Sequence, residues 1–215
     1  SVISYSAADG SGNTANCSFT VTVSYNATSI GKTVTASPAT ICSGNSTNIN
    51  IALSESGISY QLRNNANNAS IGSPVTGNGA TISLPTGALT TTTTFNILAT
   101  NPGNGCSYQL TNTATVTVNP LPASPTAGNS GRCGTGAVTI TATPGAGETI
   151  DWYAASTGGT ALLTGNTSYT TPSISATNIY YAQARNTTTG CLAATRTAVT
   201  ATISNPVAPT AGNNS

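Results

Sequence analysis

The sequence predicts an all-β protein in which antiparallel β-sandwiches follow one another like beads on a string. Three observations support this prediction. Threonine, which suits strands, and Asn, Gly and Ser, which suit turns, are abundant, whereas only 4% of residues are charged. Short segments alternate between apolar and polar residues, as half-buried strands do. The segment SPTAGNS at 124–130 returns as APTAGNN at 208–214, and such a period indicates a tandem array.

Residues 1–24 form the first predicted element, a β-hairpin. Val2, Ile3 and Tyr5 lie in one strand, and DGSGN at 9–13 is the turn. The return strand alternates apolar with hydroxyl residues up to position 24. Two strands alone are marginal in water, so we interpret 1–24 as the C-terminal hairpin of a truncated domain, with 25–32 as a linker.

Residues 33–119 form the first complete predicted domain. Its strands are marked by apolar residues at alternate positions: Ile49, Ile51 and Leu53; Ile58, Tyr60 and Leu62; Phe95, Ile97 and Ala99; Ala114, Val116 and Val118. A turn at 101–105 comes just before Cys106, which opens the last strand. About seven short strands in a unit of this size are typical of an immunoglobulin-like sandwich.

Residues 126–204 repeat this pattern after a Pro-rich linker at 120–125. Proline fixes φ and removes a donor, so we expect the linker to be extended and stiff. The apolar positions of the second domain are Val138, Ile140 and Ala142; Ile150, Trp152 and Ala154; Val199, Ala201 and Ile203. Cys191 opens its last strand, as Cys106 does in the first domain. We interpret 205–215 as a linker and the start of a further repeat.

The five cysteines predict two disulfides. Cys42 and Cys106 are 64 residues apart and bracket the first domain, and Cys133 and Cys191 are 58 apart and bracket the second. We expect each pair to be bonded, which places the protein in an oxidising compartment. Cys17 has no partner within the segment. Its expected partner precedes residue 1, and the alternative is a free or intermolecular thiol.

The charge pattern argues against two classes of partner. Five basic residues are scattered along the chain and the net charge is +1. Nucleic-acid binding requires a concentrated basic surface, and so does a polybasic membrane contact. No run of about 18 apolar residues exists to cross a bilayer. We therefore expect neither nucleic-acid binding nor membrane insertion by this segment.

Catalytic and metal sites are not predicted. The chain has no His to act as a base or to complete a zinc site with cysteines. Glu148 and Asp151 are close in sequence, but we interpret them as a turn residue and an outward-facing strand residue. Asp9, Ser11 and Asn13 have the spacing that begins a calcium loop, yet the later ligands are missing and the segment also suits a hairpin turn. We predict no enzyme activity, cofactor or metal.

Two neighbouring aromatic residues are candidates for stacking on a sugar. By alternation, Trp152 shares a face with Ile150, and a tryptophan in this strand of a sandwich is usually part of the core. Tyr153 points to the other face and is therefore the candidate for contacting a ligand.

Two stretches resemble known repeat families. YSAADGSGNTANCSFTVTV at 5–23 resembles the end of a hyalin-repeat (HYR) domain. DWYAASTGGT at 151–160, the Tyr180–Tyr181 pair and the Gly190–Cys191 pair before RTAVTATI are similar to Ig-like repeats of large Bacteroidetes surface proteins. That resemblance extends more loosely to 33–119. Such repeats occur in type IX-secreted adhesins, including SprB-like gliding-motility adhesins.

The resemblance implies a non-catalytic stalk or spacer in an extracellular adhesin filament at the cell surface. It also implies two kinds of partner, namely other repeats of the same chain and a surface polysaccharide or the substratum. One alternative is a carbohydrate-binding accessory region of a secreted enzyme, which requires exposed aromatic residues on one face. Another is a filament subunit that polymerises by strand exchange, which requires an incomplete sandwich and a donor strand.

Overall fold

Every element of secondary structure in the described part of the chain is a β-strand. The computed structural model describes residues 2–20, 31–103 and 105–205. These residues form one two-stranded hairpin and two β-sandwiches, as the fold class predicted. No helix among them is long and apolar enough to cross a membrane.

The hairpin consists of β1 (Val2–Ala8) and β2 (Thr14–Thr20). The two strands pair antiparallel, with Tyr5 opposite Cys17. The side chains from Ile3 to Ser18 are all exposed, because no second sheet covers either face within the described residues. The predicted hairpin is present, but it has no core of its own.

The first sandwich consists of two sheets. One has the order β3-β5-β8, and the other has the order β4-β11-β9-β6-β7 with β10 paired to β9. The strands are β3 (Val34–Ser37), β4 (Thr40–Cys42), β5 (Ser46–Ile51), β6 (Ser59–Asn64), β7 (Ser70–Thr76), β8 (Ile82–Ala88), β9 (Thr93–Thr100), β10 (Ser107–Gln109) and β11 (Ala114–Asn119).

The second sandwich repeats this plan with fewer strands. Its sheets have the orders β12-β14-β16 and β13-β18-β17-β15. The strands are β12 (Thr126–Gly128), β13 (Ser130–Cys133), β14 (Thr139–Thr143), β15 (Glu148–Tyr153), β16 (Ser168–Thr170), β17 (Asn178–Asn186) and β18 (Thr197–Ser204).

In both sandwiches the first stretch of chain divides between the two sheets. β3 and β12 pair antiparallel in one sheet, and β4 and β13 then pair parallel with the last strand in the other. Cys42 thereby lies opposite Asn119, and Cys133 lies opposite Ser204. This strand order is that of an immunoglobulin-like sandwich.

Each core forms from the inward-facing positions of both sheets. Strand alternation sends every second side chain inward, and burial removes it from water. The largest fully buried side chains are Tyr60, Phe95, Ile49, Ile51, Leu62, Leu84, Ile97, Leu110 and Val116 in the first sandwich, and Trp152, Ile140 and Ile150 in the second. The prediction that Trp152 belongs to the core is confirmed.

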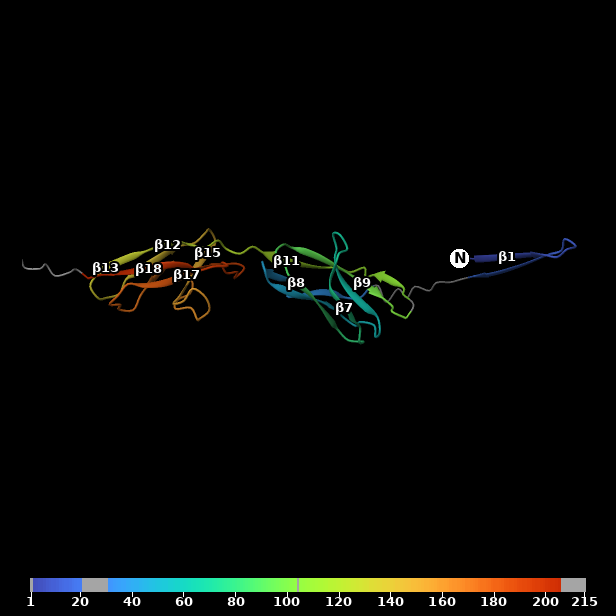
Figure 1. Ribbon diagram of the computed structural model, residues 1–215, viewed down its shortest axis with the longest axis horizontal. Coiled ribbons are helices and arrows are strands. Elements are labelled where there is room, and N and C mark those ends of the chain that lie inside the picture. The colour runs from blue at the N-terminus through green and yellow to red at the C-terminus, as the bar shows by residue number, and fades with distance from the viewer. Residues whose placement is uncertain (1, 21–30, 104, 206–215) are drawn as a thin grey trace, which may run out of the picture.

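The two sandwiches follow each other end to end, joined by the short segment after β11 (Figure 1). Pro122 and Pro125 of this segment are buried. The hydroxyls of Ser124 and Thr195 lie 2.7 Å apart, and the Thr197 hydroxyl donates to the Pro125 carbonyl at 2.8 Å. The end of the linker is thus fixed to the start of β18.

Candidate functional site at the junction between the sandwiches

A disulfide crosses from one sandwich to the other. It joins Cys42, at the end of β4, to Cys191, in the loop between β17 and β18, with their Cα atoms 5.6 Å apart. The bonded residues are 149 positions apart in sequence. The expected pairings, Cys42 with Cys106 and Cys133 with Cys191 inside each domain, are therefore wrong.

The expected pairings fail because the two cysteines of each sandwich lie at opposite ends of it. Cys42 lies opposite Asn119, where β11 stops. Cys106 directly precedes β10, which pairs with the far end of β9 at Thr100. β9 has eight residues and is antiparallel to β11, so at least about 25 Å of strand separates the two ends. A disulfide needs Cα atoms within about 7 Å.

The first half of the site is a turn at the C-terminal end of the first sandwich. Asn45 N–H donates to the Cys42 carbonyl at 3.1 Å and closes the turn. Ser43 N–H donates to the Asn119 carbonyl and Gly44 N–H to the Leu89 carbonyl, both at 2.8 Å. These bonds hold the turn against the ends of β11 and β8, so Cys42 has a fixed position next to the linker.

The second half is the loop that follows β17. Asn186 N–H donates to the Cys191 carbonyl at 2.9 Å, and Gly190 N–H donates to the Asn186 carbonyl at 3.0 Å. The Asn186 side-chain oxygen accepts from the N–H groups of Thr188 and Thr189 at 3.0 and 2.9 Å. Gly190 adopts φ +73°, a left-handed conformation that favours glycine. Cys191 is 1% exposed.

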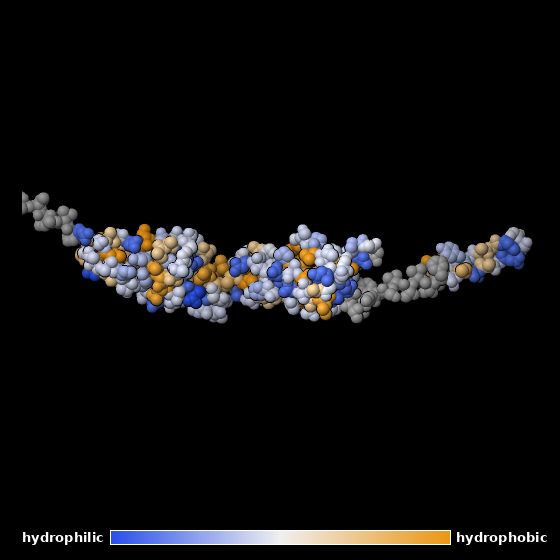
Figure 2. Space-filling view, turned by 90° about the horizontal axis from the view of Figure 1, so that it is seen from below, coloured by the Kyte–Doolittle hydropathy of each residue, from blue (hydrophilic) through white to orange (hydrophobic). Residues whose placement is uncertain are grey.

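The surface around the junction is apolar. Leu121 in the linker and Leu192 beside the disulfide are both exposed large hydrophobic residues. Figure 2 shows hydrophobic side chains over the narrow waist between the two sandwiches. In Figure 1 the orange-red loop after β17 approaches the blue start of the first sandwich beside the linker. The two sandwiches are thus connected at two points, by the linker and by the disulfide.

The other cysteines have exposed positions. Cys133 is a free thiol at the end of β13 in the second sandwich. Cys106 is exposed at the end of the first sandwich opposite to Cys42. Cys17 is also a free thiol. It is in mid-strand, whereas Cys106 and Cys191 follow directly after their turns. In the hairpin, Asp9 N–H donates to the Asn13 carbonyl and closes the turn. Asn13 therefore has the position directly after the turn that Cys106 and Cys191 have in the sandwiches.

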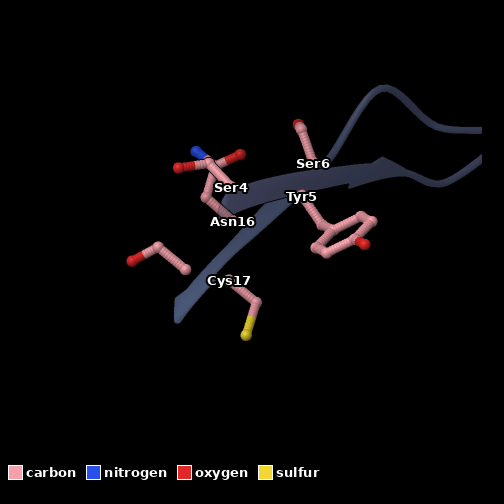
Figure 3. A pocket seen from close by; sticks show the side chains of 6 residues that line it. Ser4, Tyr5, Ser6, Asn16 and Cys17 are labelled. Atoms are coloured by element: carbon pink, nitrogen blue, oxygen red, sulfur yellow. The ribbon is translucent and has the colours of Figure 1, made fainter. Parts of the chain in front are cut away.

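The hairpin presents a small polar surface around Cys17. Figure 3 shows Tyr5 and Cys17 on one face of the two strands, with Ser4, Ser6 and Asn16 directed to the other. Tyr5 is 62% exposed. The face that contains Tyr5 and Cys17 is open, and the residues that line it include no charged side chain and form no enclosed cavity.

Tyr153 is not an exposed contact residue, contrary to expectation. It is 8% exposed, because the Arg196 guanidinium lies 3.3 Å from the centre of its ring. Arg196 is held there by the carbonyls of Ala155 and Gly158, both at 2.8 Å, and by Gln183. This cation–π contact occupies the ring face that a sugar would stack on.

The two neighbouring acids of β15 do not form a carboxylate pair. Glu148 accepts from Gly145 N–H at 3.0 Å, which is a turn contact as expected. Asp151 is 4% exposed rather than facing solvent, because Arg185 donates to both of its oxygens at 2.8 and 3.2 Å. The hydrogen bonds and charge of Asp151 raise the pKa of Arg185. Asp151 also accepts from Gly165 N–H at 2.9 Å and so anchors the loop that covers it.

The Asp9 segment is a hydrogen-bonded turn. Asp9 accepts from the Asn13 side-chain amide and from the N–H groups of Asn13 and Ser11, each at 2.9 Å. These bonds, the Asn13 side chain first, lower the pKa of Asp9. Both carboxylate oxygens face donors, and Asn13 directs its nitrogen toward them, which is the wrong atom for a cation ligand. Among the described residues, no group of three or more Cys, Asp or Glu side chains comes together.

Comparison with protein-family models supports an Ig-like fold for the second sandwich. Residues 122–206 match the family model described as "Ig-like domain CHU_C associated". No curated protein matches the sequence. Solved structures that are similar include the titin domains Z1Z2 in complex with telethonin (13% identity, covering 81% of this chain and 94% of that one, TM-score 0.34). Others are murine CEACAM1b (18%, 81% and 100%, 0.33) and fibronectin(III)-like modules of Clostridium thermocellum CbhA (19%, 80% and 95%, 0.38). Because these scores are low, the strand order described above carries the fold assignment.

Three features of the site were missed from sequence. The Asp151–Arg185 pair and the Arg196–Tyr153 stack each join residues more than 30 positions apart, and nothing local links them. The interdomain disulfide had a usable signal. Cys106 and Cys191 follow the turns after the long strands β9 and β17, and Cys42 and Cys133 end the first stretch of each domain. In a sandwich of this topology those places are at opposite ends.

Proposed function

We propose that this chain is a non-catalytic structural segment of a large cell-surface adhesin filament. In this role it is an extended, disulfide-clamped spacer that serves surface adhesion or gliding motility. The observation that carries the proposal is the disulfide between Cys42 and Cys191, which ties one sandwich to the next. A spacer needs its repeats held in line, and this bond supplies a second connection beside the linker.

Two separate connections restrict relative rotation far more than one. The linker alone permits twisting and bending, even where proline stiffens it. The disulfide leaves the first sandwich from the turn at Cys42 and enters the second at Cys191, and hydrogen bonds hold both loops. The junction therefore favours a fixed angle between the two sandwiches. By contrast, neighbouring domains that share only a small interface are expected to move relative to each other.

A disulfide at this place also supports an extracellular location. Such bonds persist in oxidising compartments and are rare where thiols are kept reduced. The family model for residues 122–206 and the resemblance to Bacteroidetes surface repeats point the same way. In this proposal the nearest partners are neighbouring repeats, and the filament contacts a surface polysaccharide or the substratum through other parts of the protein.

The alternative of a carbohydrate-binding accessory region gains no support from the described surface. Its best candidate, Tyr153, is covered by Arg196, and Trp152 is fully buried. A hollow beside β9 is lined by Asn64, Asn65, Ala66 and Thr91–Thr94, without an aromatic side chain. The polar, weakly charged faces suit a spacer.

Small-angle X-ray scattering on the full chain tests the proposal. We compare the oxidised protein with the Cys42→Ser/Cys191→Ser double variant, which removes the bond without leaving a new thiol. We expect the wild type to fit one interdomain arrangement and the variant to require a broad ensemble. The reduced wild type is the matched control and should resemble the variant.

Identical scattering from the oxidised protein and the double variant would contradict the spacer role of the disulfide. A panel of polysaccharides supplies the second test, with no saturable binding expected. Binding that Tyr153→Ala abolishes would instead favour the carbohydrate-binding alternative.

A further inference from the structure

Cys133 occupies the position in the second sandwich that Cys42 occupies in the first. Each ends the short strand that pairs parallel with the last strand of its domain, opposite Ser204 and Asn119 respectively. The residue after each cysteine then donates its N–H to that opposite residue's carbonyl, at 3.1 Å for Gly134 and 2.8 Å for Ser43. The two cysteines therefore sit at the same end of equivalent sandwiches.

Cys191 and Cys106 are equivalent in the same way at the other end. Asn101 N–H donates to the Cys106 carbonyl at 2.8 Å, as Asn186 N–H does to the Cys191 carbonyl at 2.9 Å. Gly105 and Gly190 precede these cysteines with φ +71° and +73°. Each repeat thus has two cysteines at opposite ends. Cys106 or Cys191 lies at the end that faces the preceding repeat, and Cys42 or Cys133 lies at the end that faces the following one.

We propose that Cys133 forms a disulfide with the cysteine that takes the place of Cys191 in a repeat following this segment. Successive repeats would then be linked by the same bond along the filament. The independent observation is that the equivalent Cys42 is bonded in this way to the next sandwich. The inference rests on the proposed function, because it requires a neighbouring repeat in the same filament.

The sequence after the second sandwich suits this geometry. APTAGNN at 208–214 repeats SPTAGNS at 124–130, the stretch that begins the second sandwich. From Ser204 to Pro209 the chain has five residue steps, against six from Asn119 to Pro125. Each connection has a proline three positions before the last one, Pro206 before Pro209 and Pro122 before Pro125, and the first connection also contains Pro120. A following repeat would therefore start at nearly the same distance from Cys133 as the second sandwich does from Cys42.

The bond forms by oxidation of two thiols to one disulfide. In vitro, oxidised glutathione accepts the two electrons and the two thiol protons and becomes two molecules of reduced glutathione. In the cell, a protein disulfide oxidoreductase of the oxidising compartment would take the same role.

An extended chain tests the proposal. Residues 1–214 are followed directly by residues 131–215, which places a second copy of the repeat in the register of the first. Ser175→Thr and Thr188→Ser, both at exposed positions, mark the second copy by mass. The protein is refolded with reduced and oxidised glutathione and digested with trypsin without reduction. Lys32, Arg63, Arg132, Arg185 and Arg196 place every cysteine of a repeat in a separate peptide.

We expect the unmarked peptide 133–185 to be bonded to the marked peptide 186–196, and the pair to separate on reduction. Cys133→Ser in the first copy should abolish this pair while the Cys42–Cys191 pair persists, which shows that the chain still folds. A bond between the two marked peptides, or an unmarked Cys133 that stays a thiol, would overturn the proposal. If the Cys42–Cys191 pair is still detected when the Cys133 proposal fails, the proposed function stands without a bond from Cys133 to the following repeat.

Discussion

In the first sandwich Leu62 lies opposite Ile97, whereas at the same place in the second sandwich Trp152 lies opposite Ala182. Both pairs are fully buried, and each joins neighbouring strands of the same sheet. Two side chains of middle size have been replaced by a large one and a small one. The register of the strands and the positions of the cysteines are the same in both repeats, while the side chains that fill the core differ.

The outer faces of the same strands differ as well. In the first sandwich Arg63 donates to Asn96, which is 1% exposed. The equivalent residues of the second are Tyr153 and Tyr181, and there Arg196 covers Tyr153. Close packing permits such exchanges when the total volume is kept. Backbone pairing and the cysteine-bearing ends therefore define the repeat, whereas its interior can vary.

The largest expected effect comes from removing the aromatic centre of the second core. Trp152→Ala should lower the stability of the second sandwich by about 3–5 kcal/mol, because it leaves a large cavity. Amide hydrogen exchange read by mass spectrometry separates the two sandwiches. Leu62→Ala is the matched variant and should lower the stability of the first by about 2–5 kcal/mol. Equal loss of protection in both sandwiches from either variant would show that they unfold as one unit.

The next largest effect is the stability lost when a buried ion pair is broken, compared with that lost when a more exposed pair is broken. Asp151→Asn removes the charge that faces Arg185 and should cost about 1–3 kcal/mol in the second sandwich, with some screening because the Arg185 side chain is 33% exposed. Glu55→Gln breaks the Lys32–Glu55 pair of the first sandwich, where Glu55 is 36% exposed, and should cost less than about 1 kcal/mol. Urea unfolding of each variant measures the difference. Similar losses would contradict it.

A smaller effect tests whether the two core pairs are interchangeable. Trp152→Leu and Ala182→Ile should each destabilise the second sandwich, through a cavity and through overpacking respectively. Combined, they restore the Leu–Ile pair of the first sandwich, and we expect a favourable coupling of about 1 kcal/mol. Strictly additive losses in a double-mutant cycle would mean that the surroundings, rather than the pair, set the fit.

The smallest effect is the loss of stability at high pH. Burial raises the pKa of Tyr60 in the first sandwich and of Tyr169 in the second. Because the folded pKa lies above the unfolded value of about 10, the stability that each contributes is complete below that pH and declines as the pH rises through the folded pKa. Tyrosinate absorbance of Tyr60→Phe and Tyr169→Phe should show the loss of one late-titrating group each. An unchanged titration would contradict the assignment.

Much of this architecture could be predicted from local patterns. Alternation located the strands that contain Ile49, Phe95 and Val199, and the same rule assigned Trp152 to the core. The disulfide pairing could not be obtained from spacing, since the distance between two cysteines along the chain does not say at which end of a sandwich each lies. The burial of Tyr153 depends on Arg196, more than 40 residues away, and no periodicity encodes that contact.

The interdomain disulfide also decides how the chain responds to tension. When the two ends of this segment are pulled apart, the load passes from the first strands through Cys42 to Cys191 and out along β18. The bonded cysteines are 149 positions apart in sequence, and the residues between them lie outside that path. Roughly 500 Å of contour, at about 3.4 Å per residue, therefore cannot be drawn out while the bond is intact. Most of both cores lies within this shielded length, so the bond limits how far the segment can be drawn out, and that limit depends on redox conditions.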